Sequence, residues 1–221
     1  MSGVGAVSQT PAVPARRARR LADALATRET HGRWPWMAAG AALPSSVAVL
    51  AAREPVRDDL RSLLWASLPA LFWHQTEEWV FPGGFLPWFN RDVMGSESDE
   101  FPITRRLGAV INTGLGWGVG LAGALLARRA PWLGVAFLTT NVPNAALHVS
   151  EAVRQRAYNP GLATSITLLA PVGAAGLVRV ARSRRVSGRD MALGIGLGVG
   201  VSLGTFLAMR RRMQSAHQGA G

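Results

Sequence analysis

The chain has 221 residues, of which 48% are hydrophobic and only 17% are charged. The charges are concentrated in short Arg-rich runs between long apolar stretches, a distribution that excludes an ordinary water-soluble domain. The formal net charge is +11, and every basic residue is Arg. Because the Arg residues flank apolar segments, they indicate contact with lipid headgroups and not with nucleic acid. The absence of Cys excludes disulfides and thiolate metal sites.

The apolar stretches predict an all-α polytopic transmembrane bundle. Residues 1–33 form an Arg- and Pro-rich tail, without an evident signal peptide, that we expect to be disordered or to lie on the membrane. Stretches long enough to cross a ~30 Å hydrocarbon core then occupy residues 34–52, 60–81, 107–127, 131–153, 159–178 and 190–209. The first is barely long enough and contains Pro44, Ser45 and Ser46 in its middle. The transmembrane domain therefore covers 34–209 with five or six spans, and 210–221 form a C-terminal tail.

The distribution of Arg between the two sides of the bundle bears on its topology. The positive-inside rule fits five spans better than six, and both arrangements stay open. In either arrangement we expect a multi-pass protein of a bacterial plasma membrane.

The longest internal connection covers roughly residues 82–106. It opens with a run of aromatic, Pro and Gly residues from Phe81 to Arg91. This mixture is typical of neither a helix nor an ordinary polar loop, and Trp is favoured at membrane interfaces. We expect the segment to lie in the interface, either as a lid or substrate entrance or as an anchoring loop.

Closely spaced glycines mark the third and sixth apolar stretches. They are Gly114, Gly116, Gly118 and Gly120, then Gly194, Gly196, Gly198, Gly200 and Gly204. Small residues four apart let helices approach closely in lipid. Neither set follows a predicted strand, so we interpret the glycines as packing positions and not as a nucleotide-binding loop.

A first polar cluster interrupts the 60–81 stretch. His74, Glu77 and Glu78 are spaced i, i+3 and i+4, so a helix places all three on one face. A charged carboxylate near mid-membrane costs ~2.5–3.5 kcal/mol, and for this reason such residues usually mark functional sites. The cluster is therefore a candidate site.

A second polar cluster lies in the fourth stretch, where Asn141, Asn144, His148 and Glu151 recur on one helix face. Neither cluster has an Arg within two turns upstream that could neutralise its carboxylates. If the stretch between them crosses once, the two cluster-bearing helices are parallel. Both clusters are near the C-terminal ends of their helices, so we expect them to converge at one depth near the same membrane face.

Divalent metal ions would neutralise these carboxylates and take the imidazoles as ligands. The predicted metal ligands are His74, Glu77, Glu78, His148 and Glu151. A His and a Glu on each of two facing helices resemble the bundle sites that hold two metals. Glu77, Glu78 and Asn144 are also the candidate catalytic residues.

Three further Asn residues are predicted near the same membrane face. Asn112 lies early in the third stretch, Asn141 precedes His148 by two turns, and Asn159 begins the fifth stretch. They are candidates to orient ligands or substrate, and Asn112 and Asn141 could instead form hydrogen bonds between helices. His31 and His217 lie in or near the predicted tails and are assigned no role.

Several motifs occur together in a fixed order. They are His74-Gln75-Thr76-Glu77-Glu78, Phe81-Pro82-Gly83-Gly84-Phe85, Trp88-Phe89-Asn90, Asn112, the Asn144–His148 segment and Tyr158-Asn159-Pro160-Gly161-Leu162-Ala163-Thr164. This set resembles the HXXEE family of small integral membrane proteins. The resemblance covers 74–171, within a core of about 60–180. It implies an enzyme whose shared polar site contains His74, Glu77, Glu78 and His148, and it names neither metal nor substrate.

The sequence thus predicts a membrane-embedded, metal-dependent enzyme acting on a lipophilic or amphipathic small molecule. A pair of irons suits two His and three Glu without Cys, and it would activate oxygen for hydroxylation or desaturation. One zinc held by both His residues and one Glu, with a second Glu as general base, would instead suit hydrolysis. The same residues are compatible with a transporter or a structural membrane protein, although a transport pathway usually has ionisable groups at several depths.

Overall fold

The computed structural model describes residues 28–52 and 59–218, apart from the side chains of 28–31 and 217. Residues 1–27 of the predicted tail 1–33 lie outside the described residues, as do residues 53–58 and 219–221. Within the described ranges the chain forms helices and turns and no strand, which confirms the all-α prediction. The elements are α2 (Arg28–Ala51), α3 (Leu60–Trp79), α4 (Phe85–Pro87), η1 (Trp88–Val93), α5 (Arg105–Ala109), η2 (Val110–Gly118), α6 (Val119–Leu126), α7 (Pro131–Gln155), α8 (Leu162–Thr164), η3 (Ser165–Leu169), α9 (Ala170–Ser183) and α10 (Gly188–Gln218).

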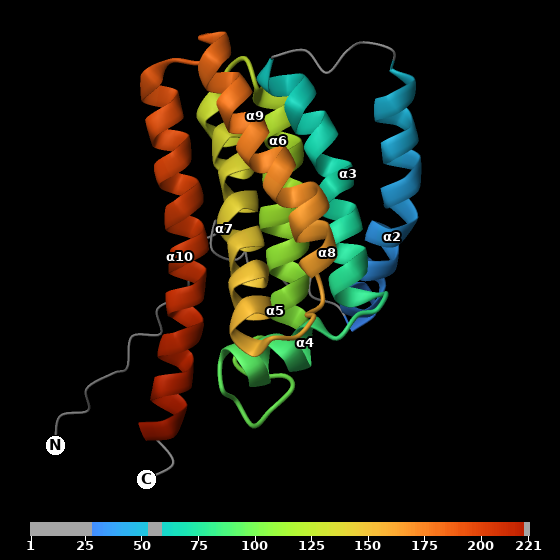
Figure 1. The fold of residues 1–221 in the computed structure, drawn as a ribbon, viewed down its shortest axis with the longest axis vertical. Helices are drawn as coiled ribbons and strands as arrows, with labels where there is room; N and C mark the ends of the chain where they lie inside the picture. The colour runs from blue at the N-terminus through green and yellow to red at the C-terminus, as the bar shows by residue number, and fades with distance from the viewer. Residues whose placement is uncertain (1–27, 53–58, 219–221) are drawn as a thin grey trace, which may run out of the picture.

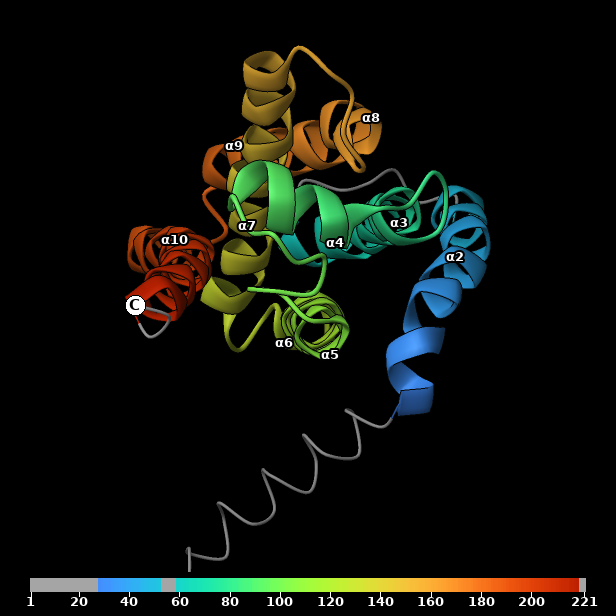
Figure 2. The ribbon, with the colours of Figure 1, turned by 90° about the horizontal axis from the view of Figure 1, so that it is seen from below.

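Successive long helices run antiparallel, and short π-helical stretches η2 and η3 continue α5 into α6 and α8 into α9 (Figure 1). Helix α7 packs against α3, α6, α9 and α10 and is thus surrounded within the bundle (Figures 1 and 2). Helices α3 and α7 run in the same direction and end at the same end of the bundle (Figure 1). This parallel arrangement is the one that the sequence predicts for the helices bearing the two polar clusters.

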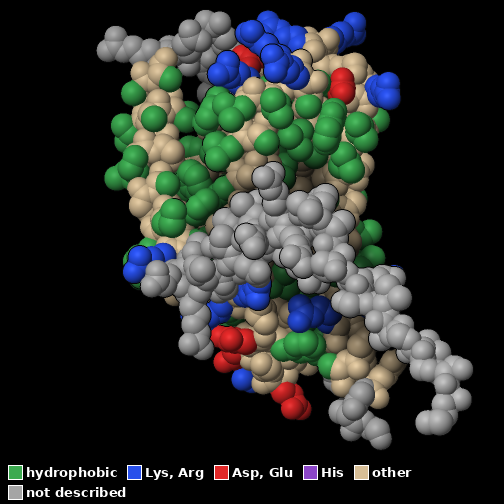
Figure 3. Space-filling model, turned by 180° about the vertical axis from the view of Figure 1, so that it is seen from behind, with side chains coloured by type: hydrophobic (Ala, Val, Ile, Leu, Met, Phe, Trp, Pro, Cys, Tyr) green, Lys and Arg blue, Asp and Glu red, His purple; other side chains and the backbone are tan. Residues whose placement is uncertain are grey.

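Within the described residues, four helices are long and apolar enough to cross a membrane: Gly32–Ala51, Arg105–Leu126, Leu162–Ser183 and Gly188–Ala216. On the face seen in Figure 3, a group of Arg side chains lies at the top of the bundle, a broad band of hydrophobic side chains lies below it, and further Arg side chains lie toward the other end. Lipid contact explains this apolar exterior, since water would not stabilise it. These features indicate a membrane protein; the count of five or six spans stays a prediction.

The stretch 34–52 forms a continuous helix despite its central Pro-Ser-Ser sequence. The hydroxyl of Ser45 donates to the carbonyl of Ala41 at 2.6 Å, and that of Ser46 donates to the carbonyl of Ala42 at 2.7 Å. Such hydroxyls satisfy backbone oxygens around a helix proline, which makes Pro44 tolerable in lipid. Helix α2 therefore begins inside the predicted tail and continues past Pro44.

The glycines of α10 divide into two faces. A Cβ atom on Gly194 would lie 2.5 Å from the Cβ of Val135, and one on Gly198 would lie 2.6 Å from the Cβ of Thr139. Only glycine permits this close approach of α10 to α7. Gly196, Gly200 and Gly204 have no such neighbour among the described residues, so two glycines of this helix serve the predicted packing role.

The connection after α3 folds across the end of the bundle where α3 and α7 end (Figure 2). Phe81 to Gly84 form a bend as expected, whereas Phe85–Val93 are helical, so the expectation of a non-helical opening was wrong for its second part. Gly83 and Gly84 have φ of 74° and 92° and turn the chain before α4, and Pro87 falls in a first turn, where no N–H is needed. The buried side chain of Asn90 then accepts a hydrogen bond from the Ile103 N–H at 3.0 Å and holds the far part of the connection.

Candidate metal centre

Three buried side chains from α3 and α7 converge near the end of the bundle that the α4–η1 segment covers. His74 and Glu78 are one turn apart on α3, and His148 faces them from α7; their exposed fractions are 1%, 5% and 1%. Nε2 of His74 lies 3.3 Å from Oε1 of Glu78, and Nε2 of His148 lies 3.2 Å from the same oxygen. A ligand atom from each residue lies within 4.8 Å of the other two, which is close enough for one metal ion.

The tautomer of His74 follows from its partner on the other side. Nδ1 of His74 lies 2.9 Å from the hydroxyl oxygen of Thr164. That hydroxyl has one proton and donates it to the Glu77 carboxylate, so it can only accept from the His74 ring. Nε2 of a neutral His74 therefore presents a lone pair to the cluster. This buried Nε2 atom has no hydrogen-bond partner among the described residues.

Asn159 fixes His148 in the same way. The Asn159 amide donates from Nδ2 to the backbone carbonyl of His148 at 2.8 Å, which identifies Oδ1 as the other amide atom. Oδ1 lies 2.8 Å from Nδ1 of His148 and accepts its proton. Nε2 of a neutral His148 is thus also unprotonated and directed toward Glu78.

These tautomers bring three electron-rich atoms together. Two imidazole lone pairs and one carboxylate oxygen repel one another in a buried site unless a proton on one imidazole or a metal ion lies among them. Metal-ligating His residues usually donate their other ring N–H to an oxygen, as His74 and His148 do. The donor set therefore fits a divalent metal ion.

Glu77 has a different environment from Glu78. Its Oε1 accepts hydrogen bonds from the Tyr158 hydroxyl and from the N–H of Ala163 at 2.9 Å. Its Oε2 accepts from the Thr164 hydroxyl and from the N–H of Thr164 at 2.7 Å. Burial and the hydrogen bond to Glu77 raise the pKa of Tyr158, so its hydroxyl remains a donor at neutral pH. Glu77 thereby anchors α8 and the residue Tyr158 that precedes it, and the structure does not bring Glu77 into the group of three.

The comparison with protein families agrees with this geometry. The sequence model of a family described as "Protein of unknown function with HXXEE motif" matches residues 65–175, which is half of the chain. The chain belongs to the HXXEE family. No curated protein and no solved structure matches it.

The residues of the HXXEE motif contact two different parts of the structure. Its His74 and its second glutamate, Glu78, meet His148, whereas its first glutamate, Glu77, holds the segment that supplies Thr164. The matched range also includes Asn159 and Thr164, the two residues that orient the imidazoles.

Glu151, one of the five predicted ligands, is not part of the group formed by His74, Glu78 and His148. Its carboxylate accepts hydrogen bonds from Nε of Arg154 at 2.8 Å and from Nε2 of Gln155 at 2.9 Å. Arg154 lies one turn downstream of Glu151, whereas the prediction considered only Arg residues upstream of the clusters. Three of the five predicted ligands thus converge, and Glu77 and Glu151 bind other groups.

The predicted Asn residues fall into three environments. Asn112 accepts a hydrogen bond from Nε2 of Gln75 at 2.9 Å and so joins α3 to η2. Asn141 is buried against Gly173 of α9, where its Nδ2 has no partner among the described residues. Asn144 is half-buried on α7, four residues before His148. Asn112 thus has the predicted interhelical role.

Several residues that enclose the HXXEE site were not predicted from the sequence. The indole of Trp88 stacks on His148, with ring centroids 4.9 Å apart and an interplanar angle of 18°. Gly161 has φ of +97°, and a Cβ atom there would lie 2.7 Å from Cε1 of His148 and 2.8 Å from Cε1 of His74. Gly161 and Thr164 belong to the Tyr158–Thr164 motif of the family resemblance, which was the only feature of the sequence that pointed to them. Neither residue is charged, so the cost of placing a charge in lipid could not identify them.

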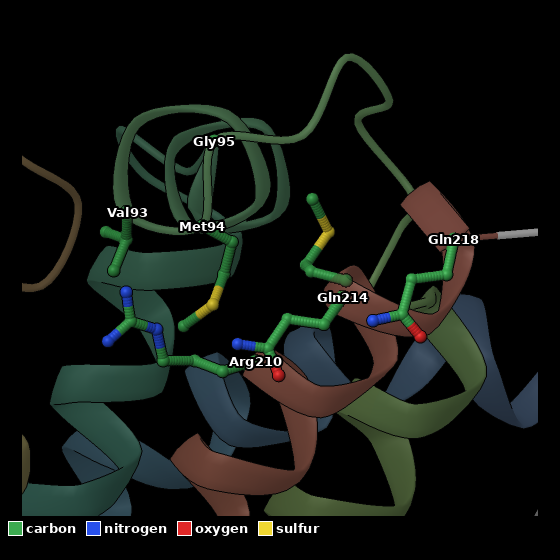
Figure 4. A pocket seen from close by; sticks show the side chains of 7 residues that line it. Val93, Met94, Gly95, Arg210, Gln214 and Gln218 are labelled. Atoms are coloured by element: carbon green, nitrogen blue, oxygen red, sulfur yellow. The ribbon is translucent and has the colours of Figure 1, made fainter. Parts of the chain in front are cut away.

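A separate hollow of about 510 Å³ lies between η1 and α10. Arg210, Gln214 and Gln218 of α10 face Val93 and Met94 across it (Figure 4). None of His74, Glu78 and His148 lines this hollow, so it is distinct from the candidate metal centre.

Proposed function

We propose that this HXXEE protein is a membrane-embedded metalloenzyme with one divalent metal ion held by His74, Glu78 and His148. The observation that carries the proposal is the convergence of two imidazole Nε2 atoms, each 3.2–3.3 Å away, on one oxygen of the buried Glu78. Two His and one carboxylate leave coordination positions open for water, oxygen or substrate. Catalytic metal sites share this incomplete protein ligation, whereas structural ones are closed.

A single metal replaces the pair that the five-ligand set suggested. Glu77 accepts four hydrogen bonds from Tyr158 before α8 and from Ala163 and Thr164 within α8, and Glu151 is bound to Arg154. A second metal would have to displace those partners. The remaining His₂Glu set matches the two-His-one-carboxylate arrangement of mononuclear iron(II) oxygenases.

Iron(II) and oxidative chemistry are the assignment that we favour. Iron(II) in such a site activates oxygen, which suits hydroxylation or desaturation of a lipophilic molecule. Because both oxygens of Glu77 are already hydrogen-bonded, no adjacent carboxylate among the described residues is free to act as the general base that hydrolysis needs. A zinc hydrolase is the second candidate, since catalytic zinc uses the same ligand types.

The residues around the metal ligands have roles that follow from their contacts. Thr164 and Asn159 hold the two imidazoles with Nε2 inward, and Trp88 covers one face of His148 and excludes water from it. Asn144, half-buried one turn before His148, is the proposed residue for orienting substrate. The substrate is a lipophilic or amphipathic molecule supplied by the membrane.

Metal analysis of the protein purified in mild detergent tests the proposal. We expect one metal ion per chain, with iron supporting the oxidative assignment and zinc the hydrolytic one. A chain that contains no metal, and that takes up neither ion after anaerobic reconstitution, would leave the three residues as a proton-sharing structural cluster.

A hydroxyl at position 164 is expected to be required for tight metal binding. Thr164→Val removes the acceptor of the His74 Nδ1 proton, whereas Thr164→Ser retains it. Loss of such an orienting partner costs ~10–100-fold in metal affinity, so the Val variant should show that loss and the Ser variant should remain near wild type. Competition with a chelator of known affinity measures both. Equal affinities in the two variants would show that the hydroxyl does not orient His74.

A further inference from the structure

A groove of about 470 Å³ lies between α2, α3 and the α8–α9 segment. Its walls are mainly apolar and include Val49 of α2, Ala66, Pro69 and Trp73 of α3, and Leu168 and Val172 beyond α8. Along α3 the groove extends from Ala66 to Trp73, two helical turns or ~10 Å. Its volume is in the range of sites that bind one small molecule.

The helices beside the groove determine what can reach it. Gly32–Ala51 on one side and Leu162–Ser183 on the other are both long and apolar enough to cross a membrane. The groove therefore opens toward the hydrocarbon region of the bilayer, where water-soluble ligands are excluded and acyl chains are abundant. A hydrocarbon chain is the occupant that this position selects.

Thr164 lies between the groove and the candidate metal centre. This residue lines the groove, and its hydroxyl contacts both Nδ1 of His74 and the carboxylate of Glu77. Trp73, which precedes His74 in the chain, is 38% exposed, and its indole N–H donates to the hydroxyl of Ser46 at 3.1 Å. A chain lying in the groove would thus end beside the residue that orients His74.

We propose that the groove binds the hydrocarbon chain of a single-chain lipid, with one end of the chain at Thr164, and that this lipid is the substrate of the metal centre. The role of the lipid as substrate rests on the proposed function, whereas the binding of its chain rests on the groove alone. A two-chain lipid fits less well, because a volume of about 470 Å³ would leave its second chain outside.

Photocrosslinking in lipid nanodiscs tests this inference. The probe is a long-chain fatty acid that carries a diazirine near the middle of its chain, and labelled peptides are identified by mass spectrometry. We expect crosslinks to concentrate on residues 66–73 and 164–172 and to be displaced by unlabelled fatty acid. A uniform distribution over exposed helix faces would mean contact with bulk lipid only and would overturn the inference.

Two positions on the same turn of η3 provide a matched pair of variants. Leu168 is half-buried in the groove, whereas Ile166 is 54% exposed and is not among the groove residues. Leu168→Trp should fill the groove and lower specific labelling by about tenfold, and Ile166→Trp should leave it unchanged. Ala66→Phe fills the groove from the opposite wall and serves if Leu168→Trp does not fold. Undiminished labelling in both filling variants would contradict the proposal.

Metal content measured on the same samples separates this inference from the proposed function. Groove labelling in a protein without metal would retain the chain-binding site and refute the metalloenzyme. A metal-containing protein without groove labelling would do the reverse. Stronger labelling by a two-chain phosphatidylcholine probe than by the fatty acid would identify a bilayer-lipid groove and refute the single-chain substrate.

Discussion

Glu78→Gln is expected to abolish metal binding while the helical fold is retained. The substitution keeps the size of the side chain but removes the negative charge on which both Nε2 atoms converge. Loss of a group that only orients a ligand costs ~10–100-fold in metal affinity, so loss of a charged ligand should cost more. Metal content by elemental analysis and helicity by circular dichroism, both in detergent, measure the two parts of this expectation.

Glu151→Gln is the matched control for that experiment. It makes the same chemical change on a neighbouring carboxylate that binds Arg154 and Gln155. We expect this variant to retain the wild-type metal content. If it loses metal as Glu78→Gln does, Glu151 reaches the metal and a larger ligand set is present. If Glu78→Gln keeps its metal, the three-residue centre is refuted.

Gly161→Ala is expected to disrupt the site by steric overlap and not by a change of charge. The added Cβ atom would lie within 2.8 Å of both imidazole rings, and the rings are held by Thr164 and Asn159. A left-handed backbone costs an alanine ~1–2 kcal/mol, and overpacking of a buried site adds ~1–3 kcal/mol. The variant should therefore unfold at a lower denaturant concentration and should bind metal weakly.

Gly84→Ala separates the two contributions. Gly84 has φ of +92°, close to the +97° of Gly161, but an added Cβ atom there would meet only an ordinary contact, with Cγ of Pro160 at 3.8 Å. This control should lose stability from backbone strain alone and should keep its metal. Equal metal loss in both variants would indicate a general loosening of the fold and would count against close packing of Gly161 on the imidazoles.

The HXXEE motif combines a metal-binding role with an anchoring role on one helix. Glu77 and Glu78 are adjacent in sequence, so on a helix their side chains leave in directions about 100° apart. Glu78 faces His148 of α7, and Glu77 faces the backbone at Thr164. Anchoring that segment also delivers the Thr164 hydroxyl to His74, so the first glutamate supports the site without belonging to the three converging residues.

The sequence by itself determined the class of the fold and the central pair of imidazoles. Long apolar stretches with Arg at their ends suffice to predict membrane helices, because burial in lipid is decided by length and composition. The i, i+4 spacing of His74 and Glu78 fixes their common face, and the parallel course of α3 and α7 brings His148 to the same depth. These features depend either on residues close together in the sequence or on the number of times that the chain crosses the membrane.

Only the tertiary structure decided which carboxylates meet the imidazoles and what encloses them. Glu77, Glu78 and Glu151 all satisfy the helical spacing, and their partners distinguish them: backbone N–H groups of the α8 segment, two His rings, and Arg154. Gly161 matters because it packs closely against the imidazole rings of His74 on α3 and His148 on α7. Helical periodicity specifies direction around one axis, whereas the choice of partner depends on how the axes and their connections pack together.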